Sequence, residues 1–62
     1  MNRNMIEATL KKEIIGIYDK PYRRAIGDSM ETTKEFVYIY NSNGHGQKYR
    51  IPWHNILGIV EY

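Results

Sequence analysis

Hydrophobic and polar positions alternate most clearly between residues 35 and 62. Residues 36–40, Phe-Val-Tyr-Ile-Tyr, combine a two-residue period with the β-branched and aromatic side chains that strands favour. Asn43-Gly44 then predicts a hairpin, because both central residues of a type I′ turn need positive φ, and the residues flanking this pair predict a looser tip. Residues 48–51 form the expected return strand.

The two faces of this hairpin differ in character, because successive side chains of a strand point to opposite sides. Four residues are expected to point into the core: Val37, Ile39, Tyr49 and Ile51. Aromatic and basic residues are expected to share the other face: Phe36, Tyr38, Tyr40, Lys48 and Arg50. The hairpin therefore predicts both a core and a candidate binding face.

The residues after the hairpin predict a sharp corner and a final strand. Residues 52–55, Pro-Trp-His-Asn, cannot extend the ladder because proline lacks a backbone N–H, and they predict one 3-10 turn. Residues 56–60 form the last expected strand, with a bend at Gly58.

The first half of the chain has a weaker pattern. Ile6, Ala8 and Leu10 alternate as in a strand, but the four-residue spacing from Ile6 to Leu10 and Ile14 also fits a helix. We favour a strand from about Ile6 that continues beyond residue 13 and bends at Gly16.

The stretch from Asp19 to Lys34 carries turn signals. Pro21 is expected to end the preceding strand, because it cannot donate to a ladder. Residues 22–34 predict a long loop that can include a short irregular strand around residues 24–26.

Together these elements predict one mostly-β domain over residues 1–62. Short strands with internal glycines and a one-turn corner are typical of a small, strongly bent, five-stranded barrel. A chain of 62 residues buries only about 60% of its unfolded surface, and it has no cysteine for a disulfide or a thiolate zinc site. We expect no metal or cofactor, which leaves self-association as the means of added stability.

Two short motifs resemble those of SH3 domains. Gly16-Ile17-Tyr18-Asp19 is similar to their opening Ala-Leu-Tyr-Asp-Tyr, and Ile51-Pro52 is similar to their closing Ile-Pro-Ser-Asn-Tyr. The paired tryptophans of the SH3 ligand groove are missing. The resemblance therefore implies the SH3-like barrel rather than proline-peptide binding.

A third motif resembles Sm-like proteins, whose barrel is nearly the same. His54-Asn55-Ile56 is similar to the His-x-Ile core of the Tyr-Lys-His-Ala-Ile signature in the bacterial RNA-chaperone branch. Pro52 and Trp53 stand at the tyrosine and lysine positions of that signature. Only His54 carries over, and the resemblance again implies an architecture.

Charge and hydropathy restrict where the chain acts and on what. The net charge is +2, and residues 1–24 carry six Lys or Arg against three acidic residues. The apolar runs are too short to span a membrane, so we expect no membrane partner and a cytoplasmic protein. An uneven basic field is compatible with a polyanionic partner.

Aromatic residues interleaved with basic ones are the main functional signal. Such a surface can stack bases and neutralise phosphates, as small barrels do with single strands. The residues expected to bind single-stranded RNA or DNA are Tyr38, Tyr40, Lys48 and Arg50, together with Tyr22, Arg23 and Arg24 on the adjoining loop. The same pattern also fits an ordinary half-buried sheet face kept soluble by its cations.

A protein-interaction role is the alternative. The last strand is apolar and, at a sheet edge, would accept another chain, which suits a homo-oligomer subunit, an interaction module or a small inhibitor of a larger protein. Trp53 is expected to plug the open end of the barrel. His54 is expected to form a local hydrogen bond or face solvent rather than bind a metal. His45 could stack on a base, but we favour simple exposure. Residues such as Asp28 and Ser29 form no catalytic signature, so the chain is not expected to be an enzyme.

Overall fold

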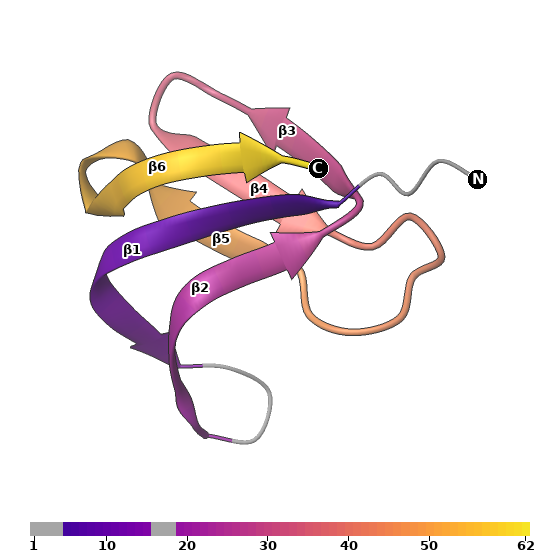
Figure 1. Cartoon of the computed structure of the whole chain (residues 1–62), viewed down its shortest axis with the longest axis horizontal. Helices are drawn as coiled ribbons and strands as arrows, with labels where there is room; N and C mark the ends of the chain where they lie inside the picture. The colour runs from indigo at the N-terminus through magenta and orange to yellow at the C-terminus, as the bar shows by residue number, and fades with distance from the viewer. Residues whose placement is uncertain (1–4, 16–18) are drawn as a thin grey trace.

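Two three-stranded antiparallel sheets make up the computed structural model, which describes residues 5–15 and 19–62. One sheet has the order β2-β1-β6, from β1 (Ile6–Ile15), β2 (Pro21–Gly27) and β6 (Ile56–Glu61). The other has the order β3-β4-β5, from β3 (Ser29–Thr32), β4 (Phe36–Tyr40) and β5 (Tyr49–Pro52). The 3-10 turn η1 (Trp53–Asn55) joins β5 to β6, and the first sheet lies in front of the second in Figure 1.

The mostly-β prediction is confirmed, as are the strand from about Ile6, the hairpin strands, the 3-10 turn and the last strand. The count of five strands is wrong, because the described residues form six. Within the described ranges, no ladder joins one sheet to the other, so a closed barrel is not seen. The bend expected at Gly16 lies outside the described residues.

The long loop predicted for residues 22–34 is wrong, because β2 and β3 occupy most of it. The short strand considered around residues 24–26 does exist and is part of the longer β2. Pro21 begins β2 rather than ending a strand, and it pairs with Ile15 at the edge of its sheet. Proline is tolerated there because an edge strand leaves one row of N–H positions unpaired. Weak periodicity hid these strands, since β2 places the charged Arg23 and Arg24 on exposed positions.

The chain passes from one sheet to the other between β2 and β3, where only Asp28 separates them. A Cβ on Gly27 would lie 2.4 Å from the carbonyl oxygen of Tyr40, so the two backbones touch where a side chain would sit. The Asp28 N–H donates to this same oxygen at 3.1 Å. Glycine is required here by the close approach of β4.

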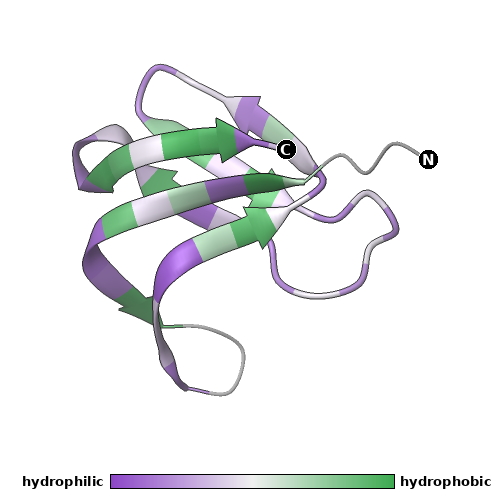
Figure 2. Cartoon of the chain, in the orientation of Figure 1, coloured by the Kyte–Doolittle hydropathy of each residue, from purple (hydrophilic) through white to green (hydrophobic). Residues whose placement is uncertain are grey.

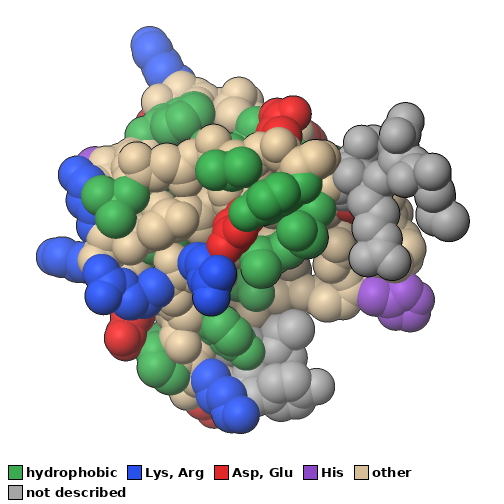
Figure 3. Space-filling view, viewed as in Figure 1, with side chains coloured by type: hydrophobic (Ala, Val, Ile, Leu, Met, Phe, Trp, Pro, Cys, Tyr) green, Lys and Arg blue, Asp and Glu red, His purple; other side chains and the backbone are tan. Residues whose placement is uncertain are grey.

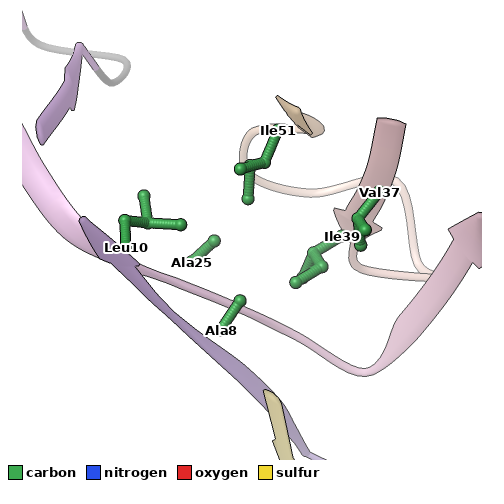
Figure 4. Packing of buried hydrophobic residues seen from close by; sticks show 6 residues of the cluster. All are labelled: Ala8, Leu10, Ala25, Val37, Ile39 and Ile51. Carbon is green, nitrogen blue, oxygen red and sulfur yellow. The ribbon is translucent and has the colours of Figure 1, made fainter. Parts of the chain in front are cut away.

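The core lies between the sheets. Each sheet contributes three fully buried side chains: Ala8, Leu10 and Ala25 from one, and Val37, Ile39 and Ile51 from the other, as Figure 4 shows. Tyr49 is half-buried and packs against this cluster. The predicted inward face of the hairpin is thus confirmed, and Figure 2 shows the matching alternation of hydropathy along β1.

Two local irregularities shape the strands and the hairpin tip. The partner on β6 changes from Gly58 at Thr9 to Ile56 at Leu10, an irregularity at the predicted bend. At the hairpin tip Gly44 and Gly46 have φ of 81° and 82°. Asn43 does not have positive φ, so the tip is not a type I′ turn but the looser connection that the flanking residues predicted. The Asn43 side-chain oxygen accepts from the His45 N–H at 2.8 Å.

Candidate functional site

The outer side of the β3-β4-β5 sheet carries the residues that we call the aromatic–basic face: Phe36, Tyr38, Tyr40, Lys48 and Arg50. The alternation of β4 places its three aromatic rings outward because Val37 and Ile39 point into the core. Tyr38 and Arg50 are directly opposite each other across the β4–β5 ladder. The sheet therefore assembles four of the seven residues expected to bind nucleic acid.

Each cation of this face lies over an aromatic ring. The Lys48 ammonium is 4.9 Å from the centre of the Tyr40 ring and 5.3 Å from that of Tyr38. The Arg50 guanidinium carbon is 5.1 Å from the centre of the Phe36 ring. These distances fall within the range of cation–π attraction, worth about 0.5–1 kcal/mol at exposed sites. The cations are thus placed beside the rings before any ligand arrives.

Glu31 gives the face a negative margin along β3. It pairs with Tyr38 across the ladder, and its Oε1 accepts a hydrogen bond from the Tyr40 hydroxyl at 2.9 Å. This bond raises the pKa of Tyr40, because the carboxylate stabilises the protonated phenol. Positive charge lies on the β5 side of the aromatic rings and negative charge on the β3 side.

Trp53 lies beside the connection between β3 and β4 and does not have the role that the sequence predicted for it. It is 44% exposed, so it is no buried plug. Its indole N–H donates to the Thr33 carbonyl at 2.9 Å and its backbone N–H to the Glu35 carbonyl at 3.3 Å. These bonds hold the indole at the surface beside the residues that precede β4, where it is more exposed than the half-buried rings of Phe36, Tyr38 and Tyr40. A lone tryptophan next to proline carried no signal for this placement.

The other three expected binding residues belong to β2 in the opposite sheet. Tyr22 pairs with Ile14, which packs against the core. Arg23 donates to the Lys11 carbonyl at 3.0 Å, and Arg24 forms a 3.0 Å ion pair with Glu7. The sequence predicted that these residues lie on a loop adjoining the hairpin, which would have placed them beside its aromatic and basic residues. Their strand placement separates the two sets.

Both histidines are exposed, which confirms the preferred prediction for His45 and the solvent-facing alternative for His54. Over the described ranges, no group of three or more His, Cys, Asp or Glu side chains is placed to hold a metal ion. No helix in that part of the chain is long and apolar enough to cross a membrane.

The cation–π contacts of this face are weaker than the stacking of a base on an aromatic ring, so a base can displace a cation from its ring. Moving one cation off a ring loses about 0.5–1 kcal/mol, whereas stacking a base on an aromatic side chain contributes about 1–3 kcal/mol. A base that takes the place of a cation therefore gains more than it displaces.

Comparison with known proteins adds no relative: no protein-family model matches this chain, and no curated protein or solved structure matches it.

Proposed function

We propose that this chain is a non-enzymatic, cytoplasmic module that binds single-stranded nucleic acid through the aromatic–basic face. The observation that carries the proposal is the placement of Lys48 over Tyr38 and Tyr40, with Arg50 over Phe36, on one open side of a sheet. Bases stack on the rings of β4 while the phosphates follow Lys48, which immediately precedes β5, and Arg50 in β5. The absence of cysteine is compatible with a reducing compartment.

The architecture supports this mode of binding. Small SH3-like and Sm-like barrels, which the sequence motifs resemble, present a curved sheet, and we propose that the two packed sheets are an open version of such a barrel. Glu31 keeps phosphates away from the β3 side, because like charges repel.

Fluorescence anisotropy with a labelled single-stranded oligonucleotide, measured across a salt series, tests the proposal. Lys48→Glu with Arg50→Glu should weaken binding about tenfold or more and reduce the slope of log K against log salt by about 1.4, for two lost phosphate contacts. The matched control is Lys11→Glu with Lys20→Glu, which changes the net charge equally on exposed residues outside this face. If both double variants lose the same affinity, the loss reflects net charge alone and the proposed site is refuted.

Substitutions at Tyr38 and Glu31 test separately whether the rings stack bases and whether the β3 side repels phosphates. Tyr38→Ala should weaken binding about fivefold to a hundredfold, because one stacked base is lost, whereas Tyr38→Phe should retain most of the affinity. Glu31→Gln should strengthen binding, because it removes the negative charge and keeps an oxygen to accept from Tyr40. Weaker binding in Glu31→Gln would contradict the proposed path of the phosphates.

Self-association is a second candidate, favoured by the outer side of the β2-β1-β6 sheet. Exposed apolar residues on or just beyond this sheet include Ile26 (45%), Leu57 (62%), Val60 (51%) and Tyr62 (62%). Figure 3 shows hydrophobic side chains gathered over this side, interrupted by charged groups. A second copy of the chain is the proposed occupant, because so small a core benefits from added burial.

Sedimentation velocity over a concentration series tests this second candidate. The wild-type chain should show a concentration-dependent dimer, and Leu57→Lys with Val60→Lys should sediment as a monomer. A wild-type monomer at every concentration would eliminate this candidate and leave nucleic-acid binding unaffected.

A further inference from the structure

A hollow of about 150 Å³ lies between the end of β4 and the loop of residues 41–48. Its lining includes Tyr40 and Lys48, which also belong to the aromatic–basic face, and Asn41 and Gln47 from the loop. Ligand pockets for drug-sized molecules run to about 300–1,000 Å³. This hollow therefore suits one planar group of the size of a nucleobase.

The loop around the hollow is held by its own hydrogen bonds. The Asp28 carboxylate accepts from the Ser42 backbone N–H at 2.8 Å and from the Ser42 hydroxyl at 3.0 Å. The Asn41 amide donates to the His45 carbonyl at 3.1 Å. A Cβ on Gly46 would lie 3.2 Å from the Asn41 amide nitrogen, so glycine leaves space that another residue would take. The hollow is thus shaped before a ligand binds.

Gln47 supplies an unused hydrogen-bonding group at this hollow. Its side-chain Oε1 is buried and has no hydrogen-bond partner among the described residues. A buried acceptor without a donor is unfavourable, so any ligand that provides a donor there gains by satisfying it. The terminal torsion of glutamine is broad, which allows the amide to turn toward the hollow.

We propose that this hollow binds one adenine base of the strand on the aromatic–basic face, an inference that rests on the proposed function. Glutamine pairs with adenine through two hydrogen bonds, in which Oε1 accepts from the N6 amino group and the amide nitrogen donates to N7. The Tyr40 ring stacks against the base, and the Lys48 ammonium contacts the adjoining phosphate. Uracil has no amino group to offer Oε1, so it can pair with the amide only by presenting its N3–H and an adjacent carbonyl, an edge that lies at a different position on the ring.

Anisotropy with labelled oligo(A), oligo(U) and oligo(C) of equal length tests the preference. Wild-type protein should bind oligo(A) about tenfold more tightly than oligo(U), the scale of one good bidentate contact. Gln47→Ala should abolish this difference and leave oligo(U) binding unchanged, which serves as the internal control for folding and for the face. Gln47→Glu should lose part of the preference, since it keeps the acceptor but loses the donor to N7.

A second measurement separates the failure of this inference from the failure of the proposed function. Adenosine monophosphate should shift the backbone N–H resonances of Gly44, Gly46 and Gln47 more than uridine monophosphate does. Equal binding of all oligonucleotides, unaltered in Gln47→Ala, would overturn the adenine site and leave the face intact. Loop shifts with adenosine monophosphate but no strand binding would support the hollow and refute the proposed function. Neither response would overturn both.

Discussion

At the residue scale, Asn55 connects the 3-10 turn to the first strand. Asn55 is 9% exposed, and it is the single buried residue among the polar and charged residues that the structure describes. Its Oδ1 accepts from the Lys12 N–H at 2.8 Å, and its Nδ2 donates to the Lys12 carbonyl at 3.2 Å. The Asn55 side chain thus makes the two hydrogen bonds to the Lys12 backbone that a neighbouring strand would make in a sheet.

Asn55→Ala should lower the free energy of unfolding by about 1–3 kcal/mol, because it leaves both backbone groups of Lys12 without their partners. Urea denaturation measures this change. Asn43→Ala is the control, since Asn43 makes one exposed hydrogen bond at the hairpin tip and should change stability by less than about 0.5 kcal/mol. Equal midpoints for the two variants would contradict the structural role of Asn55.

Asp28 connects the two-sheet crossing to the hairpin loop, and its charge should appear in the pH dependence of stability. Hydrogen bonds from Ser42 and Ser29 hold the pKa of Asp28 below its ordinary value of 3.8. In the unfolded chain the carboxyl binds its proton at higher pH, so the stabilisation is complete above that value and is lost as pH falls through the folded pKa.

Asp28→Asn should therefore be less stable than wild type at pH 7 and should lose less stability between pH 5 and the acid limit of folding. Thermal melts at a series of pH values measure both effects. Parallel curves for the two proteins would show that Asp28 contributes no linkage. Glu7, whose pKa is also lowered by hydrogen bonds from Tyr62 and Arg24, remains in both proteins and accounts for the residual slope.

At the element scale, the passage from β2 to β3 depends on a missing side chain. Gly27→Ala places a Cβ within 2.4 Å of a backbone oxygen, so β2 or β4 must shift. We expect a loss of about 1–3 kcal/mol in the free energy of unfolding, the range of overpacked sites.

Gly58→Ala is the matched control for this change, because a Cβ there meets nothing within 4 Å. Its stability should stay unchanged or rise by about 0.5–1 kcal/mol, since glycine weakens a strand. Chemical denaturation of both variants tests the contrast. A larger loss at Gly58 than at Gly27 would refute the close approach at the crossing.

At the scale of the whole molecule, six hydrophobic side chains that are buried among the described residues carry the packing between the sheets. A chain of this length has a total stability of roughly 3–9 kcal/mol. Leu10→Ala should cost about 2–5 kcal/mol, a large part of that total. Ile15→Ala, at a residue that is 63% exposed, should cost far less. Circular dichroism melts compare the two, and similar midpoints would contradict the assigned core.

Local pattern predicted the hairpin, its inward and outward faces, the 3-10 turn and the last strand. These follow from short-range rules, because a two-residue period separates the faces of a strand and proline stops a ladder. The grouping of Tyr38, Tyr40, Lys48 and Arg50 depended only on that alternation. For this reason the order of residues along the hairpin was enough to identify four of the candidate site residues.

The sequence by itself determined that this is a small β domain whose hairpin has an apolar side and an aromatic–basic side. Tertiary structure alone decided the two-sheet arrangement, the strands within residues 21–32, the surface position of Trp53 and the roles of Asp28 and Asn55. Each depends on contacts between segments distant in the sequence, such as Gly27 against Tyr40 or Asn55 against Lys12. Local pattern cannot encode such contacts, because the free energy that selects them arises only when both segments are in place.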